Sequence, residues 1–389
     1  MKNAIATPVH IMIISGEASG ELYGSLLATE LFHRFPRLSI TGVGGERMNK
    51  AGVKLIAGIS GAMGFTEALS SVRQLLKTYK LIKEMFLTNR PDLIVLIDFP
   101  DFNLKVAKTA KAMGIKVLFY VSPQVWLWRK GRVKKIARLC DRIAVILPFE
   151  EEIYKNANLP CKFVGHPVME EIESLDLNPD TLKKEFNLLP NRPVCAILPG
   201  SRHSELDKHL PILAQTFDIL KGRHPQLQFI MPLATSLNLN DNESKIINDL
   251  KQSGVIMIVG RAVEVLSVSN IALVASGTAT LQTALMGVPM VIFYKVSSVS
   301  FFIGSFLIQL KLFGLPNILA GKKIVPELMQ DNMRTHELVK AFDEIYNNTA
   351  IKEAMSSSLI NIREMFKGKR PSYETASIVT DILNDGQMK

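Results

Sequence analysis

The sequence predicts an α/β protein made of two Rossmann-like, doubly wound lobes. Three observations predict it. The chain has 389 residues, which is about twice the length of a common domain. Short apolar runs alternate with longer stretches of helical periodicity, as in βαβ units with a parallel sheet. This alternation pauses after residue 165 and starts again near residue 193, so we expect two sheets rather than one.

The first lobe is predicted over residues 1–165. It opens with a strand at His10–Ile14, a loop rich in glycine and serine, and a helix at Leu22–Phe35. Three further strands are predicted at Leu93–Ile97, Lys116–Tyr120 and Ile143–Leu147. Because these runs are almost wholly apolar, we expect helices to cover both faces of the sheet.

The second lobe is predicted over residues 193–370, after a polar segment, residues 166–192, that is expected to link the lobes. Its strands are predicted at Val194–Leu198, Leu227–Met231, Val255–Val259, Ile271–Ala275 and Pro289–Phe293. From Thr335 onward the pattern is helical, and the last helix follows Pro371. Doubly wound sheets bind ligands outside the carboxyl ends of their strands, so function is expected in the loops there.

The composition indicates an ordered globular protein with an anionic partner. Apolar residues make up 47% of the chain and no low-complexity tract occurs, which argues against disorder. A formal net charge of +10 favours nucleic acid, anionic lipid or a phosphorylated substrate. The three scattered cysteines argue against a disulfide framework or a zinc site, so a reducing cytosol is expected.

Two apolar segments have the composition of a membrane or export signal but are too short for one. The run near the N-terminus covers only about six residues, too short for the apolar region of a signal peptide, and is interpreted as the first strand. The longer segment, Val296–Leu310, is uncharged but shorter than the roughly 20 residues that span a bilayer. We predict a buried or interfacial helix there.

Two strand ends of the first lobe carry polar side chains. SGEASGELYG places Glu17 and Ser19 after the first strand, with a glycine spacing that differs from the dinucleotide fingerprint. This loop is expected either to bind a ligand through backbone N–H groups or to be a tight turn capped by Ser19. Asp98 follows the strand LIVLI and is predicted to be a general base, its pKa raised by burial. The alternative is helix capping, which suits the nearby Asp101 better.

Two strand ends of the second lobe predict a phosphate site. One carries Gly200, Ser201 and Arg202, and an arginine pairs with phosphate oxygens in a forked geometry. The other presents hydroxyls and N–H groups at a helix start, on Ser276, Gly277 and Thr278. Two such loops facing one cleft suggest a nucleotide diphosphate. The chain has no D-x-D and no His, Cys or carboxylate group with metal-ligand spacing, so no metal is expected.

A basic segment that holds both tryptophans is predicted to face a membrane. Trp126 and Trp128 precede a run of cations that begins with Arg129, Lys130 and Arg132. Indole rings suit the headgroup region and Lys and Arg attract anionic lipid. The alternative is a solvated helix face with packed tryptophans. The amphipathic stretch Glu67–Phe86 supports the membrane interpretation, and nucleic acid is not expected because the chain lacks a recognition motif for it.

Ten segments, in order, resemble the lipid-A-disaccharide synthase family over nearly the whole chain. They are SGEASGELYG, GVGGERM, MGFTEAL, IDFPDFNL, YVSPQVWLWR, VGHP, LPGSR, SGTATLQTAL, PMVIFY and LPNILAGKKIVPEL. The resemblance implies a GT-B fold in which the C-terminal lobe holds the nucleotide and a last helix, residues 371–389, crosses back to the first lobe. It also implies that UDP-2,3-diacylglucosamine is joined to the 6-hydroxyl of 2,3-diacylglucosamine 1-phosphate. The products would be a β-1,6 lipid A disaccharide 1-phosphate and UDP, with no cofactor.

The same resemblance assigns roles to residues by motif. It implies that Asp98 is the base or essential carboxylate, that Arg202 is the essential cation near the leaving diphosphate, and that Glu17 and Ser19 line the cleft. The residues that it implies for the diphosphate and ribose are Ser276, Gly277, Thr278 and Thr280, with Asn317 nearby.

Two positions depart from the family's pattern. Glu21 stands where the family often has Asp, and Gln282 stands where it usually has a glutamate that contacts the ribose. Glutamine still hydrogen-bonds a diol, but without charge, so altered uridine affinity is expected. The resemblance also implies a homodimer that is peripheral on the cytoplasmic face of the inner membrane of a Gram-negative bacterium.

Two other functions stay open at this point. Another GT-B transferase or an epimerase acting on UDP-N-acetylglucosamine would share the phosphate loops but would need no surface for acyl chains. The tryptophan segment and Val296–Leu310 argue against it. A non-catalytic protein that binds a nucleotide sugar or a lipid would keep the loops, but it could lose Asp98 and Arg202 without effect.

Overall fold

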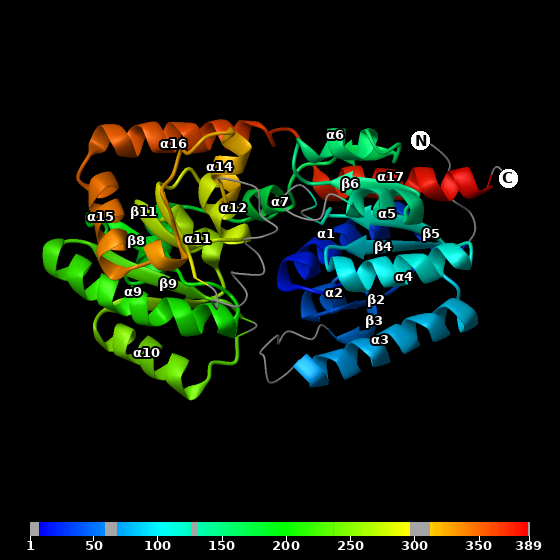
Figure 1. Cartoon of the computed structure of the whole chain (residues 1–389), viewed down its shortest axis with the longest axis horizontal. Helices are drawn as coiled ribbons and strands as arrows, with labels where there is room; N and C mark the ends of the chain where they lie inside the picture. The colour runs from blue at the N-terminus through cyan, green and yellow to red at the C-terminus, as the bar shows by residue number, and fades with distance from the viewer. Residues whose placement is uncertain are drawn as a thin grey trace. The chain divides into compact units, whose positions relative to one another are not determined.

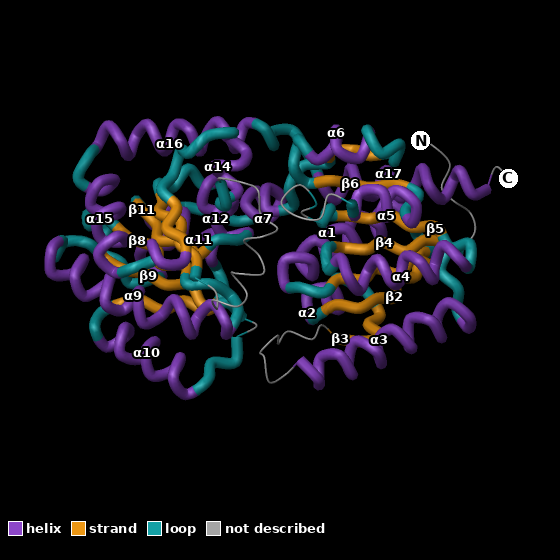
Figure 2. The backbone as a smooth tube through the Cα atoms, in the orientation of Figure 1, coloured by secondary structure: helices purple, strands orange, loops and turns teal. Residues whose placement is uncertain are grey.

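A computed structural model describes residues 8–58, 68–123, 125, 131–235, 237–295 and 312–387. The chain forms two compact units (Figure 1). The first comprises Met1–Glu170 and Gly368–Lys389, and the second comprises Glu171–Lys367. Each unit has a central parallel sheet with helices on both faces (Figure 2). The predicted fold class, two Rossmann-like α/β lobes, is therefore confirmed.

The first unit is built on a seven-stranded sheet in the order β3-β2-β1-β4-β5-β6-β7. Its strands are β1 Val9–Ser15, β2 Leu38–Gly44, β3 Lys54–Gly58, β4 Leu93–Ile97, β5 Lys116–Tyr120, β6 Arg142–Val145 and β7 Cys161–Phe163. Its first helices are α1 Ala18–Arg34, α2 Glu46–Lys50, α3 Ala68–Thr88, α4 Pro100–Ala112, α5 Arg132–Leu139 and α6 Glu150–Lys155. The winding reverses between β1 and β4. Since crossovers are right-handed, α1 and α2 cover one face and α3, α4 and α5 the other.

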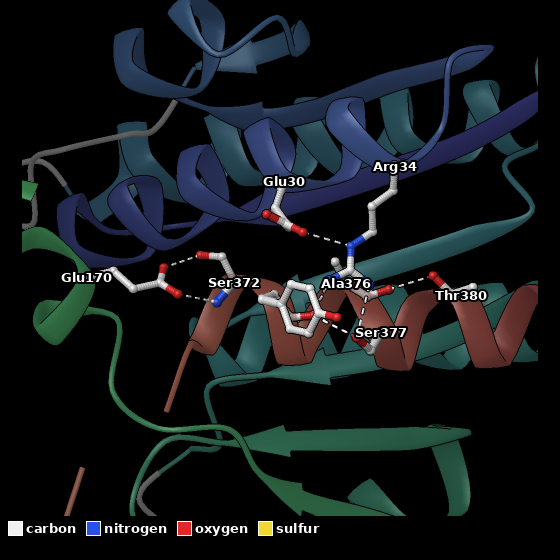
Figure 3. Close-up of polar contacts among 8 residues, drawn as sticks. Glu30, Arg34, Glu170, Ser372, Ala376, Ser377 and Thr380 are labelled. Carbon is white, nitrogen blue, oxygen red and sulfur yellow. Dashed lines mark hydrogen bonds and ion pairs between the residues drawn. The ribbon is translucent and has the colours of Figure 1, made fainter. Parts of the chain in front are cut away.

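The last helix, α17 (Pro371–Gln387), belongs to the first unit and packs against α1. Arg34 of α1 donates a hydrogen bond to the Ser377 hydroxyl at 2.9 Å. Glu170 accepts hydrogen bonds from the backbone N–H and the hydroxyl of Ser372 (Figure 3). The expected return of the C-terminal helix to the first lobe is therefore confirmed.

The second unit is built on a six-stranded sheet in the order β10-β9-β8-β11-β12-β13. Its strands are β8 Val194–Leu198, β9 Gln228–Leu233, β10 Val255–Val259, β11 Ile271–Ala275, β12 Met290–Tyr294 and β13 Glu327–Met329. Its helices include α8 Pro179–Glu185, α9 His203–Arg223, α10 Asp241–Gln252, α11 Ala262–Ser267, α12 Thr278–Leu285, α14 Leu315–Ala320, α15 Thr335–Tyr346 and α16 Thr349–Glu364; α7, Val168–Ser174, spans the boundary between the units. The winding reverses between β8 and β11, so α9 and α10 cover one face and α11 and α12 the other.

Most strands found from sequence are buried, and the exception is the partly buried edge strand β10. β4, β8 and β11 are buried along their whole length, and their apolar runs predicted their bounds. The sequence analysis missed β2, β3, β7 and β13. β2 reads LSITGVG, with three polar or glycine positions among its central residues, so it lacks a continuous apolar run. β7 and β13 are short edge strands of three residues each, which present too little pattern to detect.

Candidate active site

The predicted site residues follow the strands at which each sheet reverses its winding. In the first unit, β1 pairs with β4, and Glu17 and Asp98 lie directly after these strands. In the second unit, β8 pairs with β11, and Gly200–Arg202 and Ser276–Thr278 follow them. Open α/β sheets bind their ligands at this position, outside the carboxyl ends of the strands. Each unit therefore brings its own predicted residues together at a topological switch point.

Asp98 lies in a strained turn. Asp98 and Phe99 both have left-handed backbone angles, with φ of 49° and 45°, which cost about 1–3 kcal/mol each for residues other than glycine. The wholly buried Asn103 donates hydrogen bonds to the carbonyls of Ile97 at 3.1 Å and Asp98 at 2.7 Å. This amide closes the turn and fixes the backbone of the half-buried Asp98.

Sequence reasoning did not assign a role to Asn103. Its signal is its place inside α4, on a face that also buries Val106, Ala107 and Ala110. Asparagine is unfavourable in a helix interior because its side chain competes for backbone groups. A polar residue on a buried helix face next to a strand end therefore indicates a turn that needs support.

The loops that follow β1 and β4 are in direct contact. A Cβ atom added at Gly16 would lie 2.3 Å from the ring of Phe99, which is closer than non-bonded atoms approach. Phe99 stacks on Phe102 with ring centroids 5.3 Å apart. Position 16 therefore requires glycine for packing between two loops, a reason other than the approach of a phosphate to the backbone.

Both capping alternatives from the sequence are wrong. The residue that caps α1 is Glu17 and the residue that caps α4 is Phe99, and neither makes a side-chain capping bond. Ser19 lies in the first turn of α1. Asp101 lies in the first turn of α4, is exposed, and forms an ion pair with Arg132.

Arg132, which is predicted to face a membrane, forms an ion pair within the first unit. Its side chain is 17% exposed and binds the Asp101 carboxylate. The other residues of that prediction, Trp126, Trp128, Arg129 and Lys130, lie outside the described residues. The segment Val296–Leu310 lies outside them as well.

Helix α3 contains most of the amphipathic stretch, and its apolar stripe divides into two parts. Ile82 and Phe86 are buried against the unit, whereas Val72 is 54% and Leu76 47% exposed. The C-terminal half of the stripe is therefore core. The N-terminal half presents apolar side chains to solvent beside exposed lysines.

The phosphate loop after β8 presents a cation at a helix start. Arg202 caps α9, and its side chain is 55% exposed, with the guanidinium 3.7 Å from the carboxylate of Glu205. Glu205 is buried and accepts a hydrogen bond from the Ser201 N–H at 2.9 Å. The guanidinium is thus exposed at the carboxyl end of the sheet. The backbone of its loop is fixed by the hydrogen bond from Ser201 to Glu205.

The loop after β11 begins α12. Gly277 caps the helix with φ of 141°, and the half-buried Ser276 and Thr278 flank it. Thr280 is wholly buried, and its hydroxyl donates to the Gly277 carbonyl at 2.8 Å. Thr280 therefore fixes the loop, while the hydroxyls of Ser276 and Thr278 stand beside the N–H groups of a helix start, where anions bind.

Asn317 differs from the expected ligand contact. Its side chain is wholly buried and donates to the Val325 carbonyl at 2.9 Å and to Glu327 at 2.7 Å. Its oxygen accepts hydrogen bonds from the N–H groups of Ile324 and Val325. An asparagine amide has two donor hydrogens and two acceptor lone pairs, so all four are used within the protein. Asn317 therefore anchors the segment before β13.

The two departures from the family pattern have partners within the protein. The Glu21 carboxylate accepts a hydrogen bond from the Arg47 N–H at 2.6 Å, so it supports the turn that begins α2. The Gln282 side-chain amide donates to the Glu171 carboxylate at 3.2 Å, and both side chains are half-buried. A carboxylate is therefore present beside position 282, supplied by a different residue.

Replacing Gln282 with glutamate is expected to destabilise the second unit. Two carboxylates in contact repel each other in partly buried surroundings, and contacting residues couple by about 0.5–3 kcal/mol. We expect a loss of about 1 kcal/mol in the free energy of unfolding, measured by denaturant titration. The matched double variant, Glu171→Ala with Gln282→Glu, is expected to recover most of that loss. Equal stability of the single variant and the parent would contradict this account.

In the part of the chain that the structure describes, no group of three or more His, Cys, Asp or Glu residues is placed to hold a metal ion. No helix within the described ranges is both long enough and apolar enough to cross a bilayer.

The sequence of this chain is similar to those of known proteins from one family. A family model described as Lipid-A-disaccharide synthetase matches residues 11–377. The chain belongs to this family. It is 41% identical to the lipid-A-disaccharide synthase of Geobacter metallireducens over 377 residues, covering 96% of this chain and 97% of the relative. It is 36% identical to that of Myxococcus xanthus, covering 99% of this chain and all of the relative. The predicted resemblance is therefore confirmed over nearly the whole length.

Solved structures show the same fold at low sequence identity. The glycotransferase of kitacinnamycin has a TM-score of 0.62 at 15% identity and covers 97% of this chain and 100% of its own. The UDP-GlcNAc 2-epimerase from Neisseria meningitidis bound to UDP-GlcNAc has a TM-score of 0.66 at 14% identity, with coverage of 97% and 99%. These likenesses show the GT-B fold, which glycosyltransferases and epimerases share, so the reaction has to be argued from the family and the site.

Proposed function

We propose that the chain is an inverting glycosyltransferase of lipid A biosynthesis. It joins UDP-2,3-diacylglucosamine to the 6-hydroxyl of 2,3-diacylglucosamine 1-phosphate, and releases UDP and the β-1,6 disaccharide 1-phosphate. The observation that carries this proposal is the family match over residues 11–377, supported by relatives at 36–41% identity over nearly the whole chain. The alternative of an epimerase or another UDP-N-acetylglucosamine transferase has support only from the shared fold.

Asp98 is proposed as the base for the acceptor. Its carboxylate takes the proton of the 6-hydroxyl while that oxygen forms a bond to the anomeric carbon of the donor. The bond between this carbon and the diphosphate oxygen breaks, and its electron pair leaves with UDP. The attack from the opposite side inverts the anomeric centre. The rigid turn held by Asn103 supports this role, because general bases need a fixed position relative to the proton they remove.

Arg202 and the loop N–H groups are proposed to bind the leaving diphosphate. Negative charge grows on the departing oxygen as the bond breaks, so fixed positive charge there lowers the barrier. Gly200 contributes its backbone N–H group and Arg202 contributes a forked cation, while the Ser201 N–H is held by Glu205. Ser276, Gly277, Thr278 and Thr280 form the second phosphate loop, and Gln282 is proposed to reach the ribose with the Glu171 carboxylate beside it.

The two lobes are proposed to divide the substrates. Residues 1–165 with 371–389 form the acceptor- and membrane-facing lobe, residues 193–370 bind the UDP-sugar, and residues 166–192 link them. We propose a homodimer on the cytoplasmic face of the inner membrane. The exposed Val72 and Leu76 on α3, with lysines along the same helix, support attachment to an anionic surface.

Vesicle binding is expected to depend on salt and on α3. Lysines near an anionic surface contribute about 1 kcal/mol each, so Lys77→Glu with Lys80→Glu should weaken binding to phosphatidylglycerol vesicles at least about 10-fold. Raising the salt to about 0.5 M should have a similar effect, because it screens the charges. The matched control is Lys251→Glu on α10, in the other unit. Cosedimentation with vesicles that changes neither with salt nor in the α3 variants would contradict attachment to an anionic surface through α3.

The proposed reaction is tested by omitting one substrate at a time. Purified protein with both acylated sugars should release UDP in proportion to the disaccharide formed. Donor alone should release almost none, because the acceptor hydroxyl supplies the attacking oxygen. UDP release that does not require the acceptor would contradict a transferase.

A further inference from the structure

Two ionisable side chains on the buried face of α9, Glu205 and His209, contact the loops at the carboxyl end of the second sheet. They lie one helical turn apart, so they are neighbours on the same face. Neither was assigned a role from the sequence. The structure places both directly behind the loop that carries Arg202.

Glu205 supports the loop Gly200–Arg202 through a hydrogen bond to the loop backbone. It is 7% exposed, and its Oε2 accepts the Ser201 N–H at 2.9 Å. A Cβ atom at Gly200, where φ is 119°, would lie 2.5 Å from the same oxygen. The loop therefore folds tightly over the carboxylate, and only glycine fits at position 200.

The second oxygen of Glu205 contacts two other groups of the site. It accepts the Tyr294 hydroxyl at 3.4 Å, and the Arg202 guanidinium lies 3.7 Å away. A buried carboxylate costs stability unless hydrogen bonds and opposite charge compensate it. Here each compensating contact comes from a loop at the end of β8 or from the end of β12, so the carboxylate ties these groups together.

His209 joins the same two strand ends through its ring. It is wholly buried, with Nδ1 2.7 Å from the Pro199 carbonyl and Nε2 3.1 Å from the Lys295 N–H. A carbonyl only accepts and an amide N–H only donates, so the ring is neutral and carries its proton on Nδ1. Burial lowers the pKa of His209, so the ring stays neutral. The ring thus fixes the end of β8 at a set distance from the end of β12.

We propose that Glu205 and His209 are positioning residues for the diphosphate. They set the backbone of Gly200 and Ser201 and the rotamer of Arg202, so that these groups meet the leaving diphosphate without reorganising. This inference rests on the proposed function, because it takes a nucleoside diphosphate as the ligand of that loop. Groups behind a site that orient the contacting residues commonly change affinity or activity about 10- to 100-fold.

The test compares Glu205→Gln with Asp207→Asn, an exposed carboxylate on the same helix. Glutamine keeps the shape but cannot accept with both oxygens or attract Arg202. We expect Glu205→Gln to weaken UDP binding in calorimetry about 10-fold and to raise the KM for the donor similarly, with the KM for the acceptor unchanged. Asp207→Asn should match the parent in UDP affinity and in the KM values for donor and acceptor.

Two His209 variants separate positioning from bulk packing. His209→Asn keeps a donor toward Pro199, whereas His209→Leu loses both hydrogen bonds. We expect graded losses of UDP affinity, larger for leucine, in protein whose circular dichroism matches the parent. If Glu205→Gln does not fold, His209→Asn carries the test alone. Folded variants with parental UDP affinity and donor KM would overturn the inference.

The outcome also separates this inference from the proposed reaction. If the parent binds UDP and the variants weaken it, but no disaccharide forms from the two acylated sugars, the reaction is wrong and the positioning role stands. If disaccharide forms equally well in the parent and in folded Glu205→Gln and His209→Asn, the reaction stands and the positioning role is wrong.

Discussion

Replacing Asp98 with asparagine is expected to lower kcat by about 100- to 10,000-fold, the usual contribution of a general base. The substitution removes the proton acceptor and keeps the shape of the side chain. It also suits the backbone, because φ at Asp98 is 49° and asparagine tolerates the left-handed region better than most residues. Asp98→Ala adds backbone strain to the loss of the carboxylate, so asparagine is the cleaner test.

The measurement is the rate of disaccharide formation at saturating donor and acceptor. The matched control is Asp92→Asn, at the opposite end of β4, where the carboxylate accepts the His10 N–H at 2.8 Å. An asparagine oxygen still accepts that bond, so the control is expected to keep near-parental turnover. A folded Asp98→Asn protein with more than about a tenth of the parental kcat would show that Asp98 is not the base.

Arg202→Ala is expected to lower kcat by about 100- to 1,000-fold, as for other groups that stabilise charge in the transition state. The loss in kcat should exceed the loss in UDP affinity, because the charge on the leaving oxygen grows as the bond breaks. Arg202→Lys keeps the charge but loses the forked geometry, so it should fall between the parent and alanine.

The control for Arg202 is Lys208→Ala, an exposed cation on the same helix. It should change neither kcat nor UDP binding. If Arg202→Ala weakens UDP binding as much as it lowers kcat/KM and leaves kcat unchanged, Arg202 binds the ground state only, and its proposed role at the leaving group is wrong.

The sequence predicts the strands at the centre of each sheet because those strands are buried on both faces. β4, β5, β8 and β11 match the predicted ranges at both ends, and the loops after β4, β8 and β11 hold most of the predicted catalytic and substrate-binding residues. β10, a partly buried edge strand, also matches because its residues are all apolar. Topology then follows from two reversals of winding. Predicting the central strands therefore also locates the candidate site, because ligands of such sheets bind where those strands end.

What the sequence does not predict depends on contacts between distant segments. Asn103 supports Asp98 through backbone carbonyls, and Glu205 and His209 reach loops that only the fold brings near. Asn317 fits the family's motif, yet its amide is used within the protein. Such roles need three-dimensional hydrogen-bond partners, which neither spacing nor composition encodes.

The central claim is the joining of two acylated glucosamines, and mass spectrometry of the product tests it most directly. Purified protein with UDP-2,3-diacylglucosamine and 2,3-diacylglucosamine 1-phosphate should give one new species whose mass equals the two substrates less UDP. NMR of that species should show a β linkage from the anomeric carbon to oxygen 6. A donor isomer of unchanged mass, or a free acylated sugar with no disaccharide, would contradict the account.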